Sequence, residues 1–130
     1  MLSLSIGGIS VEINLENGVY TAGIYSATGK TYLYTLLRRY AKNVAVAVTY
    51  DDLRFDIDIE KEIEKVKPKL VLFDRYDMYE GRFDELIERI ANSCIVIVDY
   101  KSEGNLLNIS QDVKFSLTEN KLEVTAYDSI

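Results

Sequence analysis

The sequence predicts an α/β protein with a mostly parallel sheet, flanking helices, and antiparallel strands at the N- and C-terminal ends. Between Val19 and Asp99, short apolar runs alternate with amphipathic helical stripes, which is typical of parallel strands joined by helical crossovers. Before and after this segment, apolar residues recur with a period of two, as in half-buried strands. At 130 residues and 48% hydrophobic, the chain is expected to form one globular domain over residues 1–130.

The N-terminal region predicts three strands and two turns. Apolar and polar residues alternate over Leu2–Ile6 and again over Ile9–Leu15, the pattern of strands with one buried face. Gly7-Gly8 lies between these two segments and predicts a hairpin turn. Asn17-Gly18 is a second turn signal, and Val19–Ile24 is expected to form the third strand.

The middle of the chain predicts three helices, each followed by a buried strand. The helices are indicated by apolar residues at spacings of three and four, and Pro68 is expected to end the second helix. The strands are indicated by runs of four or five apolar residues. The predicted helices cover about 33–40, 59–66 and 83–90, and the predicted strands cover Val44–Val48, Leu70–Phe73 and Cys94–Val98. The chain then returns to strands, with a hairpin of Val113–Leu117 and Lys121–Tyr127 around residues 118–120.

Composition excludes several kinds of chemistry. The 15 basic and 21 acidic residues give a net charge of −6, so charge does not indicate nucleic-acid binding. Without histidine and with Cys94 as the only cysteine, the chain offers no internal disulfide, imidazole base or zinc site of the usual kind. Its apolar runs are far shorter than the roughly 20 residues of a membrane-spanning helix. The N-terminus lacks the basic start and apolar block of a signal peptide, so we expect a cytoplasmic location.

One motif indicates chemistry. Gly29-Lys30-Thr31 stands where the predicted strand Val19–Ile24 gives way to the first helix. A helix start exposes unpaired backbone N–H groups and the positive end of the helix dipole, which together favour phosphate. A lysine there can reach the β- and γ-phosphates of a nucleotide, and the next hydroxyl can ligate magnesium.

The segment Gly23–Thr31 resembles the Walker A loop of the P-loop NTPases. The resemblance implies that Lys30 holds the phosphates and that Thr31 ligates Mg²⁺. It also implies that backbone amides wrap the β-phosphate, and these belong to Ser26, Ala27, Thr28 and Gly29. The usual spacing would place the first glycine at position 24, where Ile24 stands, so the resemblance is to a degenerate Walker A.

A second segment resembles the Walker B strand of the same superfamily. The apolar run Leu70–Phe73 ends in Asp74, and the resemblance implies that this aspartate holds magnesium. Arg75 follows, where many P-loop ATPases have a glutamate that polarises the attacking water, so hydrolysis is expected to be weak or to need a partner. Asp74-Arg75-Tyr76 also resembles a segment of thymidylate kinases.

Other acidic residues stand at the ends of predicted strands. Asp99 follows the run Cys94–Val98, and Asp51-Asp52 follow Val44–Val48. Acids often end buried strands because the chain meets solvent there. Alternatively, one of these acids could join a magnesium site at the edge of the sheet. Several acids without a cation would repel phosphate, which is a further reason to expect Mg²⁺.

These observations predict a protein that binds a nucleotide, ATP or another nucleoside triphosphate with Mg²⁺, and that is a weak or partner-activated ATPase. Lys30 and Asp74 are the expected catalytic residues. One alternative is a non-enzymatic interaction module with a degenerate P-loop fold, and another is a small nucleoside or nucleotide kinase. Because no lid or signature segment is present, a protein partner or a second copy is expected to supply the missing groups, as an arginine finger in trans does.

Overall fold

A computed structural model describes residues 1–22, 30–49, 52, 57–79, 81–99 and 111–126, without the side chains of residues 30, 31, 77 and 111. One eight-stranded sheet has the order β1-β2-β8-β7-β3-β6-β5-β4. The strands are β1 Leu2–Ile6, β2 Ile9–Asn14, β3 Gly18–Ala22, β4 Ala45–Val48, β5 Leu70–Phe73, β6 Ile95–Asp99, β7 Gln111–Leu117 and β8 Lys121–Ala126. The helices are α1 Lys30–Tyr40, α3 Ile59–Val66, α4 Asp84–Ile90 and the 3₁₀-helix η1 Tyr76–Tyr79.

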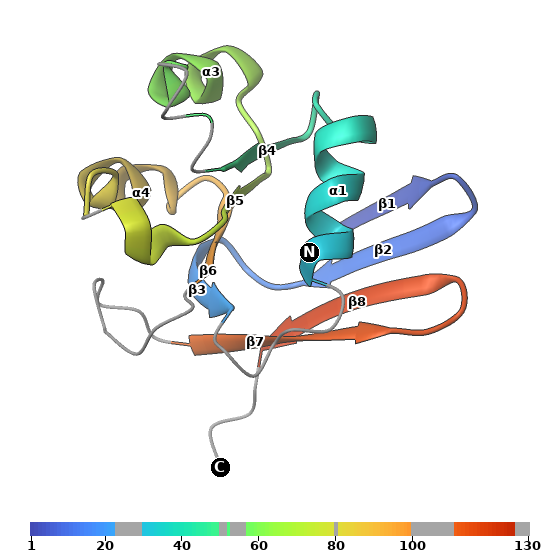
Figure 1. Ribbon diagram of the computed structural model, residues 1–130. Coiled ribbons are helices and arrows are strands. Elements are labelled where there is room, and N and C mark those ends of the chain that lie inside the picture. Colours follow the sequence, from blue (N-terminus) through green and yellow to red (C-terminus); the bar gives the residue numbers. More distant parts are fainter. Residues whose placement is uncertain (23–29, 50–51, 53–56, 80, 100–110, 127–130) are drawn as a thin grey trace.

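The sheet mixes strand directions and curls into a half-barrel (Figure 1). The two hairpins, β1·β2 and β7·β8, are antiparallel. β8 joins them into one sheet, because it also pairs with β2 in parallel, with Ser10 opposite Lys121. On the other side of β7, the strands β3, β6, β5 and β4 are parallel neighbours.

The predicted fold class, a P-loop NTPase-like and mostly parallel sheet with flanking helices, is wrong for this molecule. The described chain is mostly strand, and its terminal strands make up half of a single mixed, curled sheet. Apolar periodicity identifies each strand but does not say which distant strand it joins. Here β2 and β8, from opposite ends of the chain, pair along most of their length.

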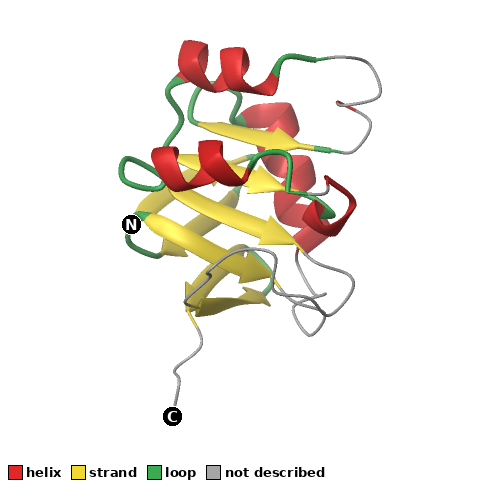
Figure 2. Ribbon diagram, turned by 90° about the vertical axis from the view of Figure 1, so that its left-hand side faces the viewer, coloured by secondary structure: helices red, strands yellow, loops and turns green. Residues whose placement is uncertain are grey.

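Each face of the sheet contributes to a separate apolar core. α1 packs on one face with Leu33, Leu36 and Leu37, against side chains from β1, β2, β7 and β8 as well as from the central strands. α3, α4 and η1 pack on the other face, over β4, β5 and β6. In β5, Leu72 belongs to the first core and Phe73 to the second, as expected from the alternation of side chains along a strand. Figure 2 shows the strands as a twisted array with helices on either side.

The predicted hairpin turns at both ends of the chain are confirmed. Gly7 and Gly8 link β1 to β2 with φ angles of 53° and 81°, both in the left-handed region that a type I′ turn requires. Residues 118–120 link β7 to β8, and the Thr118 N–H donates to the Lys121 carbonyl across the loop at 2.9 Å. The predicted central strands and helices also occur, and their described ends differ from the predicted ones by at most a few residues. Residues 23 and 24 of the predicted strand Val19–Ile24 lie outside the described part of the chain.

Candidate functional site

The carboxyl ends of β3, β6, β5 and β4 form one edge of the sheet. In the register of these strands, Ala22 lies beside Asp99, and Phe73 lies beside both Val98 and Val48. Asp74, one residue beyond Phe73, is therefore level with Asp99 on the neighbouring strand. Two acidic residues thus stand at equivalent positions on adjacent strand ends.

α1 runs back from this edge toward the opposite edge of the sheet. It follows β3 and precedes β4, and these strands point the same way in the sheet. A helix that connects such strands must begin near the carboxyl end of the first and finish near the amino end of the second. The hydrogen bond from the Ala45 N–H to the Ala41 carbonyl, at 2.9 Å, shows α1 ending beside the start of β4. The first turn of α1 therefore belongs to the edge that carries Asp74 and Asp99.

The first turn of α1 carries positive potential and no acidic residue. Lys30 and Thr31 are its first two residues, and no acid occupies the first turn. The first four N–H groups of a helix have no partner within the helix, and the helix dipole adds the equivalent of about half a positive charge there. This end of α1 therefore favours an anion.

Asp74 lies on the same side of the sheet as α1. The pKa of Tyr34, on α1, is raised to about 12, chiefly by burial; the Arg38 hydrogen bond and charge oppose this rise, and the charges of Asp52 and Asp74 contribute to it. The Asp74 carboxylate is thus close enough to α1 for its charge to act on Tyr34. The backbone N–H of Asp74 donates to the Val48 carbonyl at 2.9 Å, which fixes this residue at the end of β5.

Asp99 is the most deeply buried acid among the described residues, with 1% of its surface exposed. In β6, Ile95 and Ile97 face the core that contains α1, and Val96 and Val98 face the other core. By the same alternation, Asp99 points toward the α1 side. Asp99 therefore adds a second acid to this side of the edge.

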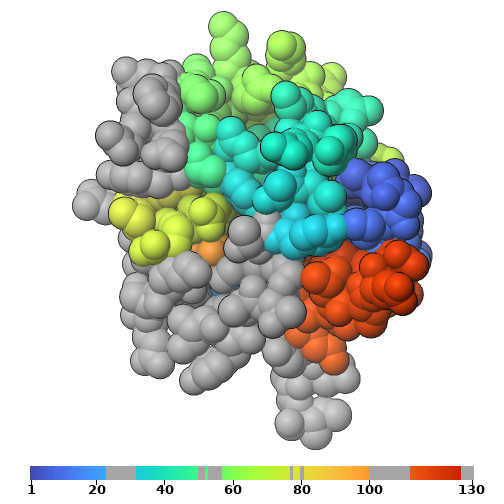
Figure 3. All heavy atoms as spheres, turned by 45° about the vertical axis from the view of Figure 1, so that its right-hand side comes forward, coloured from blue at the N-terminus to red at the C-terminus, as the bar shows by residue number. Residues whose placement is uncertain are grey.

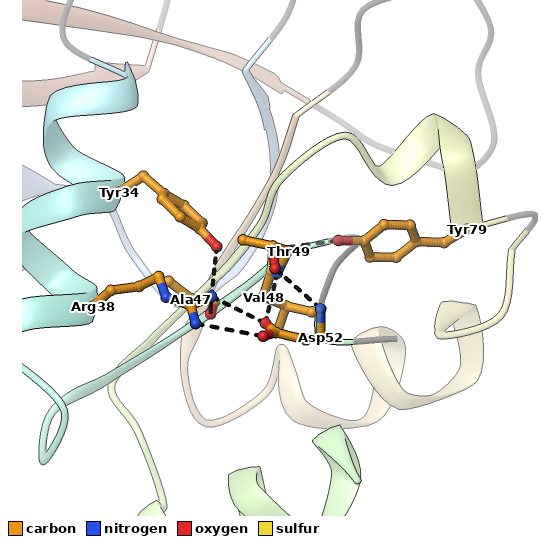
Figure 4. Close-up of polar contacts among 7 residues, drawn as sticks. All are labelled: Tyr34, Arg38, Ala47, Val48, Thr49, Asp52 and Tyr79. Carbon is orange, nitrogen blue, oxygen red and sulfur yellow. Dashed lines mark hydrogen bonds and ion pairs between the residues drawn. The ribbon is translucent and has the colours of Figure 1, made fainter. Parts of the chain in front are cut away.

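Next to these acids, a network of polar contacts joins α1 to the end of β4 (Figure 4). Arg38 donates to Asp52 from both terminal nitrogens, at 3.1 and 3.4 Å, and to the Tyr34 hydroxyl at 2.9 Å. Asp52 also accepts the Thr49 N–H at 2.8 Å, and its own N–H donates to the Thr49 hydroxyl at 3.2 Å. Asp52 is therefore neutralised by Arg38.

The sequence did not reveal this network, although Tyr34 and Arg38 have the four-residue spacing of neighbours on one helix face. Their partner Asp52 stands 14 residues beyond Arg38, so the pairing depends on the chain path between them.

Tyr76, in the segment that resembles thymidylate kinases, is a core residue. Its side chain is fully buried and packs edge-to-face on Phe73, with ring centroids 5.4 Å apart. Its hydroxyl donates to Asp84 Oδ1 at 2.6 Å and accepts the Phe83 N–H at 3.2 Å. These contacts hold the start of α4 and account for Tyr76 without a substrate.

Both parts of the predicted site come to one edge of the sheet. Lys30 and Thr31 open α1, and Asp74 directly follows β5, so the same edge and the same face hold them. Four predicted phosphate-binding residues lie outside the described part of the chain, and these are Ser26, Ala27, Thr28 and Gly29. No cluster of three or more acidic or cysteine side chains suited to a metal occurs among the residues that the structure describes.

No protein-family model matches the sequence, and no curated protein matches it significantly. Among the described residues, no helix has the length and apolar character needed to cross a membrane.

Proposed function

We propose that this chain binds the phosphates of a nucleoside triphosphate, with Mg²⁺, between the first turn of α1 and the ends of β5 and β6. The main support for the proposal is that the first turn of α1 and Asp74 lie on the same face at the same edge of the sheet. This helix turn begins with Lys30-Thr31 and contains no acidic residue. The strands β3, β6, β5 and β4 are parallel, and ligands of parallel strands bind outside their carboxyl ends. The helix start supplies attraction for phosphate, and the acids supply attraction for a cation.

The charges at this edge suit a phosphate–magnesium pair better than either ion alone. Asp74 and Asp99 would repel an unaccompanied phosphate, and the positive end of α1 would repel an unaccompanied cation. Mg²⁺ needs only one or two protein carboxylates when phosphates and water complete its ligands, so a cluster of three acids is not required. Asp74 and the Thr31 hydroxyl would hold the ion, and the ion would neutralise phosphate charge when bound.

The remaining residues bear on whether bound nucleotide is hydrolysed. Lys30 and the N–H groups of the α1 first turn would orient the phosphates and stabilise negative charge on them. The residue after Asp74 is Arg75, and an arginine cannot take the place of the glutamate that polarises the attacking water in many P-loop ATPases. Hydrolysis by the chain alone is therefore proposed to be slow and to be accelerated by a partner.

The proposal is tested by thermal unfolding with ATP, GTP and ADP, each with and without Mg²⁺. A ligand at about 100 times its dissociation constant stabilises the folded state by about 2.7 kcal/mol. We expect stabilisation by a triphosphate that depends on Mg²⁺ and is lost in Lys30→Ala and in Asp74→Asn. Lys42→Ala removes the same charge at an exposed position after α1 and should bind as the wild type does.

One result would refute the proposed site, and another would show binding without catalysis. If no nucleotide stabilises the wild-type chain, or if Lys30→Ala and Lys42→Ala respond equally, the proposed site is wrong. If Mg²⁺-dependent binding occurs without phosphate release, the site stands, and the chain acts as a nucleotide-dependent binding module until a partner completes it.

A further inference from the structure

The two edge strands of the sheet differ in how their backbone groups are used. β4 and β1 are the outermost strands. The carbonyls of Val44 and Val48 point toward β5, because they accept the N–H groups of Lys69 and Asp74. The backbone N–H and C=O groups of the alternate residues, Ala45 and Ala47, therefore point away from β5. The Ala45 N–H donates to the Ala41 carbonyl, and the Ala47 carbonyl accepts a hydrogen bond from Arg38. The protein's own chain therefore satisfies one outward group of each of these two residues.

The β1 edge carries outward-pointing groups at its serines. In a two-residue hairpin, the residues next to the turn exchange both backbone hydrogen bonds. Ile6 and Ile9 flank the turn here, so Leu2, Leu4 and Ile6 bond to β2. The N–H and C=O groups of Ser3 and Ser5 then point away from β2. No hydrogen bond to these groups is found among the residues that the structure describes.

β1 also lacks the features that normally prevent edge-to-edge pairing. Proteins protect edge strands with charged residues, proline or bulges. The five residues of β1, Leu2–Ile6, carry no charge and no proline, and their pairing with β2 is continuous, without a bulge. Figure 3 shows this N-terminal hairpin, in blue, on the surface beside α1 and the β7–β8 hairpin.

We propose that β1 is the interface of a symmetric dimer of this chain, in which β1 of each copy pairs antiparallel with β1 of the other. The sequence of β1 is self-complementary about Leu4. Antiparallel pairing centred there sets Leu2 opposite Ile6 of the second copy and each Ser3 opposite the second Ser5. All apolar side chains then stay on the core face, and all serines stay on the outer face.

The hydrogen bonds fit the same register. Ser3 of one copy and Ser5 of the other exchange both backbone bonds, twice per dimer, which satisfies all four outward groups of each copy. The Leu4 pair on the two-fold axis is then a non-hydrogen-bonded pair, in which side chains approach most closely. Leu4 is only half-buried in the single chain, so pairing covers its remaining apolar surface. Two sheets thereby become one continuous sheet across the axis.

The test is the mass of the chain in sedimentation equilibrium, with two matched variants that differ only at position 5. The wild type should show twice the 14.8 kDa mass of one chain. Ser3→Lys with Ser5→Lys sets like charges opposite each other and should give a monomer. Ser3→Lys with Ser5→Glu sets opposite charges in the same places and should remain a dimer. The Ser3→Lys substitution is common to both variants and faces Glu12 of β2 in both, so its effect on the single chain is matched.

Ser5→Pro provides a second route to the same result. It removes one outward N–H without removing a bond to β2, a position at which edge strands accept proline, and it should also give a folded monomer by circular dichroism. The proposal is overturned if the wild type is monomeric at every concentration at which it is soluble. It is equally overturned if Ser5→Pro or the lysine pair stays dimeric, or if the lysine–glutamate variant dissociates like the lysine pair.

Discussion

Tyr76 shows at the scale of one residue how a polar group organises the fold beside the candidate site. Its ring lies in the core and packs against the rings of Phe73 and Tyr79. Its hydroxyl joins the Asp84 carboxylate to the Phe83 N–H. The segment after Asp74 is thereby fixed to α4.

Tyr76→Phe is expected to destabilise the protein by about 1–3 kcal/mol, because the buried Phe83 N–H and the part-buried Asp84 carboxylate each lose a partner. The free energy of unfolding in urea measures this loss. Tyr40→Phe removes a hydroxyl from a side chain that is 62% exposed and should change stability little. Equal effects of the two substitutions would show that the Tyr76 hydroxyl contributes nothing specific.

Cys94 gives the protein a pH dependence in alkaline solution. The residue is buried directly before β6, and burial raises the pKa of its thiol from 9.0 to about 11. Between these values the unfolded chain has lost the proton and the folded chain keeps it, so stability falls as pH rises. Unfolding free energies measured from pH 9 to 11 should fall less steeply in Cys94→Ala than in the wild type. Parallel slopes would contradict the assignment.

At the scale of elements, α3 has clear end signals. Asp58 precedes the helix and accepts the Lys61 N–H at 3.0 Å, the hydrogen bond of an N-cap. At the other end, Lys67 takes a left-handed conformation with a φ of 51°, and its N–H bonds to the Ile63 carbonyl. Pro68 follows and cannot continue the helix. The sequence predicted this helix closely because both ends are determined locally.

Asp58→Ala should destabilise the protein by about 1 kcal/mol, because the cap hydrogen bond is lost. Asp58→Asn keeps an oxygen in the same place and is the matched control, with a smaller expected loss. Chemical denaturation of the three proteins measures the difference. Similar losses in the alanine and asparagine variants would show that the charge of Asp58, and not its cap, stabilises α3.

At the scale of the whole molecule, local signals predicted the elements but not their assembly. Gly7-Gly8, the apolar run Leu70–Phe73 and Pro68 each act within a few residues, and the structure has the turn, strand and helix end they indicate. The pairing of β2 with β8 joins residues more than 100 positions apart. Both strands show the same alternating pattern, and that pattern would suit many partners. The predicted fold class failed for this reason.

The candidate site was predictable to the extent that it follows from chain order. A lysine at a helix start and an aspartate at a strand end can be recognised from neighbouring residues, as Lys30 and Asp74 were. Their location on one face depends on the crossover from β3 through α1 to β4. The contacts among Tyr34, Arg38 and Asp52 depend further on how α1 packs, which no local pattern encodes.

The most direct test of the proposed site is residue-resolved NMR of the chain titrated with Mg²⁺ and ATP. The account predicts that amide signals of Lys30–Leu33, in the first turn of α1, and of Asp74 shift and gain protection from hydrogen exchange. The first turn of α3, which Asp58 already caps, serves as the internal control and should not respond. Unchanged signals at α1 and Asp74, or changes concentrated in another part of the molecule, would contradict the account.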